Sequence, residues 1–260
     1  MPEQPPAARA TPPTAGAPSW AGLAGALGHR SVRRVELKML LDPGQDLYEL
    51  AGRVGLDPAR AESVRVRYFD DRDHSLSHQG VTIRVRESGR RAELGLKLRS
   101  ARPVELPPAL RRLPGLMSEL DALPDRSHWS LAIKSTVVRT RRSAPVDHWL
   151  ELCSPEQRAF LAAITGRASL ARYDATYGPA MATRLVGSTQ DLGRLMLERW
   201  QLPEGRELVE LSTKCRPRHA RSTATAIRTL VHARAVIPSA LQRTKTEECL
   251  RTYLVPAPAG

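Results

Sequence analysis

The stretch YFDDRDHSLSHQGVTIRVRESGRRAELGLKLR (68–99) decides the fold. Within it, VTIRVRES (81–88) and AELGLKLRS (92–100) alternate apolar and polar residues with a period of two, which is typical of β-strands with two different faces. Only a few residues around Gly89 separate the two segments. We therefore expect them to form an antiparallel hairpin.

The polar faces of this hairpin are strongly cationic. Arg84 and Arg86 share one face of the first strand, and Lys97 and Arg99 share one face of the second. A half-buried sheet also alternates apolar with charged residues, so each strand taken alone is compatible with an ordinary solvated face. Like charges on neighbouring strands destabilise a sheet, however. The crowding of cations therefore indicates an anion bound between them.

The same alternation recurs along the chain. VRRVELKMLL (32–41) places Arg34, Glu36 and Lys38 on one face. Further predicted strands are 63–71, 131–142, 148–152, 194–200 and 207–214, the last two forming a second hairpin across 202–205. Predicted helices are 46–54, 107–123, 155–164 and 222–235. The pattern predicts an α+β fold in which about eight, mostly antiparallel strands form one barrel with peripheral helices. Residues 1–30 are expected to be a disordered Pro/Ala-rich tail, 31–254 the domain and 255–260 a second tail.

Charge is the strongest signal of the overall composition. The 260 residues include 40 Lys and Arg against 27 Asp and Glu, a formal net charge of +13. The planar arginine fork matches phosphate oxygens, so the partner should be anionic: nucleic acid, a nucleotide, polyphosphate or an acidic surface. Aromatic residues make up only 4% of the chain. That scarcity argues against a reader of single-stranded nucleic acid, which stacks bases on aromatic side chains, so a nucleic-acid partner is not favoured.

Other sequence features restrict the class of protein. No apolar run approaches the roughly 20 residues of a membrane span, and the N-terminus lacks the pattern of a secretory signal. Cys153, Cys215 and Cys249 are far apart, so neither a disulfide framework nor a zinc site is expected. These features favour a cytoplasmic protein without a membrane partner, and the oligomeric state stays open.

Two segments carry a resemblance to a known family. VELKMLL (35–41) and the stretch 68–99 resemble the CYTH proteins, or triphosphate tunnel metalloenzymes, whose first strand bears E-x-E-x-K. The match is close over 34–99 and looser over 131–254. The resemblance implies an eight-stranded antiparallel tunnel that acts on triphosphates with a divalent metal, here Mg²⁺ or Mn²⁺.

The resemblance also implies roles for particular residues. Carried over position by position, the basic groups of the reaction would be Lys38, Arg84, Arg86 and Lys97, and further substrate contacts would come from Arg139, Arg141 and Lys245. The metal ligands would be Glu36, Glu198 and Glu210, because carboxylates that face a cationic cavity are suited to hold a hard cation.

One departure from the family pattern keeps two functions open. Arg34 stands where the motif has its first glutamate, and Glu210 has Leu208 and Ser212 as its same-face neighbours instead of a second glutamate. The first candidate function is metal-dependent hydrolysis of tripolyphosphate, a nucleoside triphosphate or thiamine triphosphate. The second is a polyphosphate- or polyanion-binding module without catalysis. A nucleic-acid-binding protein, suggested by charge alone, is a third and weaker alternative.

Overall fold

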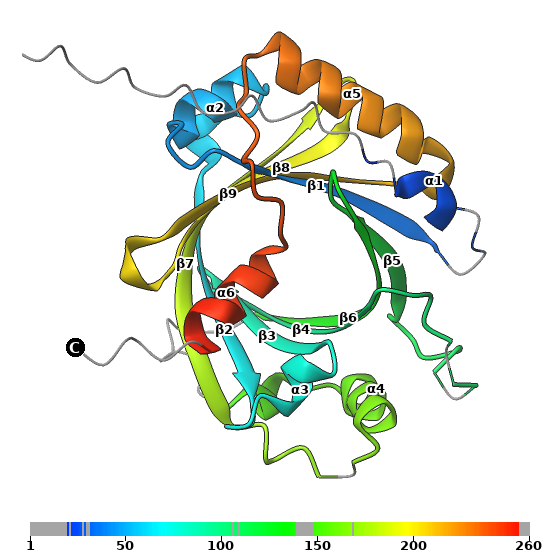
Figure 1. Ribbon diagram of the computed structural model, residues 1–260. Helices are drawn as coiled ribbons and strands as arrows, with labels where there is room; N and C mark the ends of the chain where they lie inside the picture. The colour runs from blue at the N-terminus through cyan, green and yellow to red at the C-terminus, as the bar shows by residue number, and fades with distance from the viewer. Residues whose placement is uncertain are drawn as a thin grey trace, which may run out of the picture.

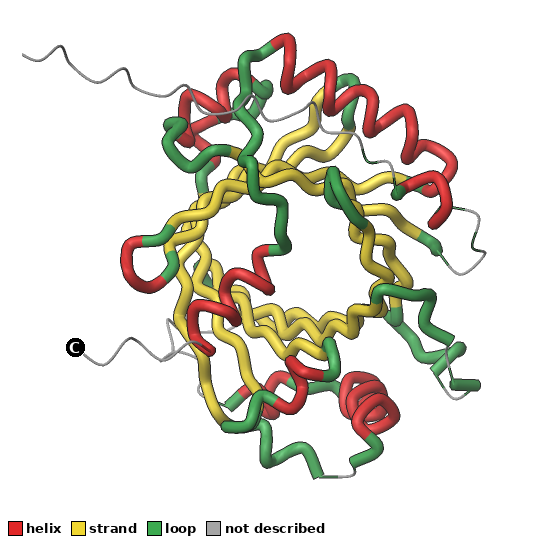
Figure 2. The backbone as a smooth tube through the Cα atoms, in the orientation of Figure 1, coloured by secondary structure: helices red, strands yellow, loops and turns green. Residues whose placement is uncertain are grey.

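The barrel is built from nine strands in the part of the chain that the structure describes. The computed structural model describes residues 20–254 except 21, 28, 30–31, 106, 109, 139–147 and 168. The strands are β1 (Arg34–Leu41), β2 (Glu62–Asp70), β3 (Val81–Ser88), β4 (Arg91–Ser100), β5 (Met117–Ala122), β6 (Ser127–Val138), β7 (Ala175–Thr189), β8 (Gly193–Gln201) and β9 (Glu207–Cys215). They close in the order β1-β5-β6-β4-β3-β2-β7-β8-β9 (Figures 1 and 2).

The predicted α+β barrel with peripheral helices is confirmed, but its described part has nine strands instead of eight and is mixed instead of purely antiparallel. Eight of the nine neighbouring pairs are antiparallel, but β1 runs parallel to β5. The predicted hairpins are confirmed: β3 pairs with β4 across Gly89, and β8 pairs with β9. The predicted strand at 148–152 is instead the 3₁₀ helix η2 (Trp149–Leu152).

Two strands were missed for identifiable reasons. β5 lies in the predicted helix 107–123, where leucines at helical spacing imitate an amphipathic helix. In the structure β5 is held by hydrogen-bonded neighbours on both sides, β1 and β6, and Leu120 is buried in the core. β7 carries Gly178 and Pro179, residues that weaken a strand signal.

Helices cover the outside of the barrel. They are α1 (Leu23–Ala26), α2 (Leu47–Arg53), α3 (Ser75–His78), α4 (Pro155–Thr165), α5 (Ala220–Ala233) and α6 (Lys245–Leu254), with the 3₁₀ helices η1 (Pro58–Arg60), η3 (Pro203–Gly205) and η4 (Pro217–His219). Local sequence sets where two of them begin. The Asp46 side chain accepts hydrogen bonds from the first turn of α2, and Ser154 forms a capping box with Gln157 at α4. No helix among the described residues is long and apolar enough to cross a membrane.

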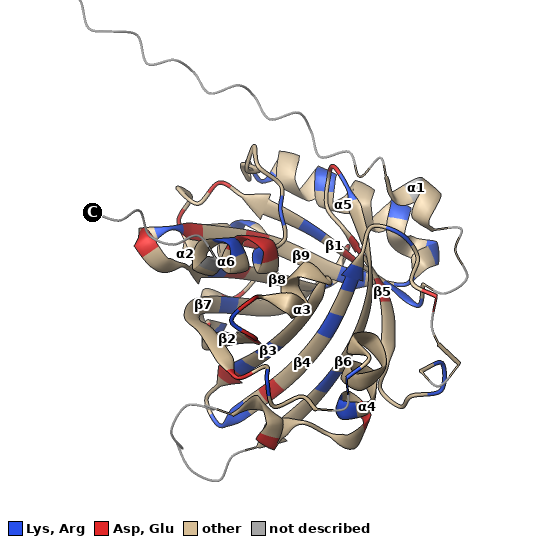
Figure 3. Ribbon diagram, turned by 60° about the horizontal axis from the view of Figure 1, so that its bottom comes forward, with Lys and Arg blue, Asp and Glu red and all other residues tan. Residues whose placement is uncertain are grey.

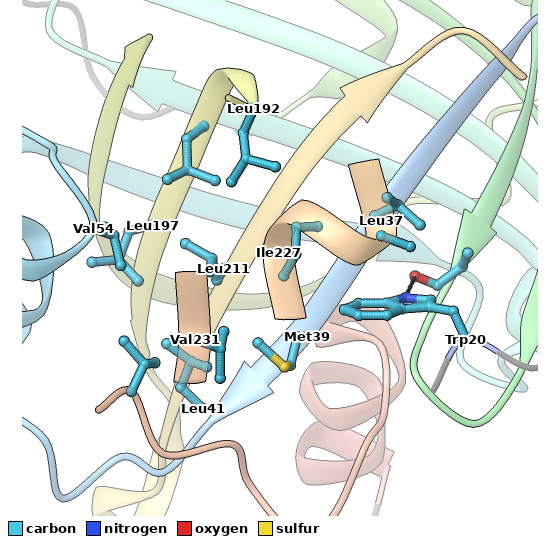
Figure 4. Packing of buried hydrophobic residues seen from close by; sticks show 14 of the residues in the cluster. Trp20, Leu37, Met39, Leu41, Val54, Leu192, Leu197, Leu211, Ile227 and Val231 are labelled. Carbon is cyan, nitrogen blue, oxygen red and sulfur yellow. Dashed lines mark hydrogen bonds between the residues drawn. The ribbon is translucent and has the colours of Figure 1, made fainter. Parts of the chain in front are cut away.

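The apolar faces of the strands point outward and are buried under these helices. In the larger cluster, Leu37 and Met39 of β1 and Leu211 of β9 belong to the same buried core as Ile227 and Val231 of α5 (Figure 4). A second cluster joins the outer face of β3, β4 and β6 to α3, α4 and η2. Because side chains alternate along a strand, the charged partners on β1, β3 and β4 must face the lumen.

The boundary of the N-terminal tail at residue 30 is also corrected. Trp20 and Leu23 are each only 3% exposed and belong to the α5 cluster. The Trp20 indole donates a hydrogen bond to the carbonyl of Ala122 at 3.2 Å (Figure 4). The described fold therefore includes residues that composition alone assigned to the tail.

Helix α6 lies across one end of the barrel (Figure 1). The segment before it is fixed to the end of β1, where Leu41 bridges to Pro238 and the Gln242 side chain bonds both main-chain groups of Leu40. The helix then packs into an apolar cluster from β2, β7 and β8 that includes Tyr68, Trp200 and Cys249. Lys245 and Thr246 at the start of α6 line the cavity of the barrel, so α6 bounds the cavity at this end.

Candidate functional site

The lumen holds a cavity of about 690 Å³ with an unusual excess of positive charge. Basic positions recur along the barrel strands (Figure 3). Among the residues that the structure describes, the lining includes thirteen Lys or Arg against three Glu. The basic members are Arg33, Arg34, Lys38, Arg84, Arg86, Lys97, Arg99, Lys134, Arg184, Arg194, Lys214, Arg216 and Lys245. Such a concentration of cations in a low-dielectric cavity creates a site for a polyanion.

The mouth of the cavity lies opposite α6. Arg34 is the first residue of β1, Arg194 the second of β8 and Lys214 the last but one of β9, and these three strands are neighbours. All three side chains line the cavity and are also exposed to solvent. The mouth of the cavity therefore has a basic rim.

Two arginines of β3 form the least neutralised part of the wall. The Nε atoms of Arg84 and Arg86 are buried and have no hydrogen-bond partner. Arg86 approaches Glu198 at 3.7 Å, and no carboxylate of the described residues lies within ion-pair distance of Arg84. Burial and the neighbouring Arg84 charge lower the pKa of Arg86. A buried N–H group without an acceptor is costly, and the Nε–H groups of this wall would be suited to the oxygens of an added anion.

A group of three carboxylates lies on the β1 and β5 wall. Glu36, Glu119 and Asp121 are buried, and one oxygen of each lies within 4.8 Å of the others. Glu36 is a predicted ligand, whereas Glu119 and Asp121 come from the strand that was predicted as helix. The short alternation of polar and apolar residues in ELDA (119–122) was the one local signal of a strand here.

Three lysines are interleaved with these carboxylates. Lys38 Nζ lies 3.0 Å from Glu36 and 3.5 Å from Asp121, Lys97 Nζ lies 2.6 Å from Asp121, and Lys214 Nζ lies 2.8 Å from Glu119. Burial alone would raise the pKa of Asp121, but Lys38 and Lys97 outweigh it and hold that pKa well below its usual range. Together the three lysines likewise outweigh burial at Glu36 and lower its pKa, so Glu36 and Asp121 are ionised at neutral pH.

The residues of this group suit a hard divalent cation. Mg²⁺ and Mn²⁺ prefer carboxylate oxygens, and three carboxylates converge here within reach of one ion. Both oxygens of Asp121 are buried and form ion pairs with Lys38, Lys97 and Arg99, so a bound cation would displace at least one of these contacts.

The other two predicted metal ligands lie elsewhere in the lumen. Glu198 of β8 is opposite Glu210 of β9, and Lys245 of α6 forms ion pairs with both. The Trp200 indole also donates to Glu198 at 3.3 Å. Burial opposes the ionisation of Glu198, but Lys245 and Arg86 lower its pKa to about 2. These contacts hold α6 against the barrel. Among the described residues, the carboxylate group consists of Glu36, Glu119 and Asp121 and includes neither Glu198 nor Glu210.

The structure thus brings most of the predicted residues together. Lys38, Arg84, Arg86, Lys97 and Lys245 all line one cavity with Glu36. Arg139 and Arg141 lie outside the described residues. Lys134, Arg184 and Arg194 line the same cavity but were not proposed from the sequence.

Comparison with known proteins supports the fold. No protein-family model matches the sequence, and no curated protein matches it. Among solved structures, a Bacillus halodurans protein described as a candidate adenylate cyclase superposes with a TM-score of 0.58 at 17% identity, covering 84% of this chain and 97% of that one. The chain shares its fold with that protein. A Hippeastrum protein, described as a candidate adenylyl cyclase with dominant triphosphatase activity, gives a TM-score of 0.55 at 11% identity over 86% of this chain and 98% of its own.

Proposed function

We propose that this protein binds the triphosphate end of its substrate in the barrel and hydrolyses it with the help of a divalent metal. The observation that carries the proposal is Arg84, without an ion pair among the described residues and with a buried Nε that lacks a hydrogen-bond partner, beside Arg86 in a cavity with thirteen basic and three acidic described lining residues. A triphosphate supplies the anionic oxygens that these guanidinium groups lack. The triphosphatase activity described for the Hippeastrum neighbour is in accord with this chemistry.

The two walls of the cavity would have different roles, one in phosphate binding and the other in metal binding. Arg84 and Arg86 of β3, with Lys97 of β4, would hold phosphate oxygens and stabilise the charge that develops during phosphoryl transfer. Glu36, Glu119 and Asp121 on the opposite wall would hold Mg²⁺ or Mn²⁺, which neutralises phosphate oxygens and aligns the attacking water when bound. Lys38 contacts Glu36 and Asp121 at once, so it lies within the carboxylate group.

Arg34 stands where the family motif has its first glutamate, and Glu119 of β5 can replace that missing carboxylate. In the parallel pairing of β1 with β5, Arg34 is in register with Glu119, and Glu36 is in register with Asp121. Two carboxylates of β5 thus stand beside the single carboxylate of β1. We infer that β5 supplies the metal ligands that the first strand lacks.

The test is phosphate release from tripolyphosphate, ATP and thiamine triphosphate, each with and without Mn²⁺. We expect release from at least one of them, and only with metal. If the protein binds tripolyphosphate tightly but releases phosphate from none of them, it is the polyanion-binding module without catalysis. In that case Arg34→Glu, which restores the motif carboxylate, should create metal-dependent release.

A further inference from the structure

The outer surface of the barrel carries a second basic feature that the tunnel chemistry does not use. From Leu211 to Thr246 the sequence contains eight Lys or Arg and no Asp or Glu. Part of this stretch lines the cavity, through Lys214, Arg216 and Lys245. The rest forms η4 and α5 on the outside of the barrel (Figure 1).

Helix α5 exposes a continuous basic stripe. Its buried residues are Ala220, Ala224, Ile227 and Val231, which pack on the barrel. On the opposite side, Arg218, Arg221, Thr225, Arg228 and His232 follow one another at spacings of three or four residues, and all five are exposed. We call these five residues the basic ridge. At a rise of about 1.5 Å per residue, the ridge is about 20 Å long.

The ridge begins at the mouth of the cavity. Lys214 and Arg216 line the cavity and are exposed, and Arg218 follows two residues later in η4. No carboxylate interrupts the sequence between them. Cationic groups therefore lead without a break from the cavity, over its rim and onto α5.

The composition of the ridge narrows the kind of partner. Its exposed side chains are arginine, histidine and threonine, without a large apolar residue. A membrane-bound helix or a protein interface would need an apolar or aromatic anchor. A single-stranded nucleic acid would need aromatic side chains on which its bases can stack, and the ridge has none. A phosphate chain without bases needs only the cations.

We propose that the basic ridge binds the outer part of a long linear polyphosphate whose terminal phosphates occupy the cavity. This inference rests on the proposed function, because the cavity must hold the chain end. It makes a polyphosphate longer than tripolyphosphate the preferred ligand, since only such a chain reaches both the cavity and α5. Because the mouth with its basic rim lies at the end of the barrel opposite α6, the rest of the chain would extend outward past this rim.

The test compares two variants that remove the same charge. The ridge variant is Arg218→Ser/Arg221→Ser/Arg228→Ser, and the matched control is Arg102→Ser/Arg167→Ser/Arg251→Ser, which changes exposed arginines away from the ridge. Binding of tripolyphosphate and of long-chain polyphosphate is measured by calorimetry across a range of salt concentrations. Thermal unfolding of each variant confirms that it is folded.

We expect the wild type and the control to bind long-chain polyphosphate at least tenfold more tightly than tripolyphosphate. The ridge variant should lose that preference and keep its affinity for tripolyphosphate. For the long chain, the slope of log affinity against log salt concentration should become shallower by about 2–3. Each phosphate contact contributes roughly 0.7–0.9 to this slope, and the ridge variant removes three arginines.

Three outcomes would overturn the inference. The first is a ridge variant that binds long-chain polyphosphate as the control does. The second is a single-stranded oligonucleotide that competes for the ridge as well as polyphosphate does, because the partner would then be nucleic acid. The third is a long chain that binds the wild type no better than tripolyphosphate. Failure of phosphate binding in the cavity, the part of the proposed function on which the inference rests, looks different: tripolyphosphate would then bind none of the proteins.

Discussion

Arg34 of β1 lies in parallel register with Glu119 of β5. The motif glutamate that the first strand lacks is therefore matched by a carboxylate on the adjoining strand. Glu119 in turn forms one buried group with Glu36 and Asp121. The positively charged Arg34 at the start of β1 is thus compatible with a metal site formed by Glu36, Glu119 and Asp121.

The first prediction concerns the metal ligands. Glu119→Gln should weaken Mn²⁺ binding by about tenfold or more. Loss of a residue that only hydrogen-bonds to a metal ligand typically lowers metal affinity by about that factor, and loss of a ligand itself should cost no less. Glu210→Gln should leave Mn²⁺ affinity within about twofold, since Glu210 is paired with Lys245. Electron paramagnetic resonance of free Mn²⁺ measures both. A large loss of Mn²⁺ affinity in Glu210→Gln with little loss in Glu119→Gln would show that Glu210, and not Glu119, is a metal ligand.

The second prediction concerns Arg84. Arg84→Met keeps the aliphatic stem and removes the charge, so tripolyphosphate affinity should fall by about 1.5–3 kcal/mol, the range for a hydrogen bond to a charged group. Because Arg84 Nε is buried without a partner, thermal stability should stay the same or rise. Arg53→Met, on the exposed face of α2, is the control. A loss of stability in Arg84→Met would mean that the fold itself depends on this charge.

The third prediction is a dependence of stability on pH. Because the pKa of Glu198 in the folded protein, about 2, lies below its ordinary 4.5, its stabilising effect is present above pH 4.5 and is lost as pH falls toward 2. The effect amounts to about 3 kcal/mol. Urea unfolding at a series of pH values should show it in the wild type.

Two variants isolate this contribution. Glu198→Gln should be less stable at neutral pH and should lack the corresponding part of the acid-induced loss. Glu204→Gln, at an exposed position in η3, should follow the wild-type profile. Parallel profiles for Glu198→Gln and the wild type would show that Glu198 is not ionised by its contacts with Lys245 and Arg86.

The fourth prediction concerns the N-terminal segment. Trp20→Ala should cost about 3–5 kcal/mol of unfolding free energy, the usual range for truncating a buried tryptophan, because Trp20 is 3% exposed and bonded to Ala122. Tyr48→Ala, whose aromatic side chain is 51% exposed, should cost much less. Equal effects in chemical denaturation would show that Trp20 contributes nothing to the core.

The sequence was most informative where structure is local. The β3–β4 hairpin could be predicted because both strands alternate with a period of two and the connection contains Gly89. The inward direction of Arg84, Arg86 and Lys97 follows from the same alternation once the strands close into a barrel. These positions therefore needed no long-range information.

The carboxylate group could not be predicted for a physical reason. Leu113, Leu116 and Leu120 satisfy helical spacing, and only the neighbours β1 and β6 make this segment a strand. The meeting of Glu36 with Asp121 depends on a parallel pairing between segments far apart in the chain. Local alternation carries no information about which distant strand will be the neighbour.

The most direct test of the account is phosphate release from tripolyphosphate by the wild type and by Glu119→Gln, with Mn²⁺ or with a chelator. The account predicts release by the wild type that requires Mn²⁺, and release reduced at least about tenfold in Glu119→Gln at limiting metal. Release that is unchanged in Glu119→Gln, or that continues in the wild type with chelator, would contradict a catalytic metal held by the carboxylates of β1 and β5.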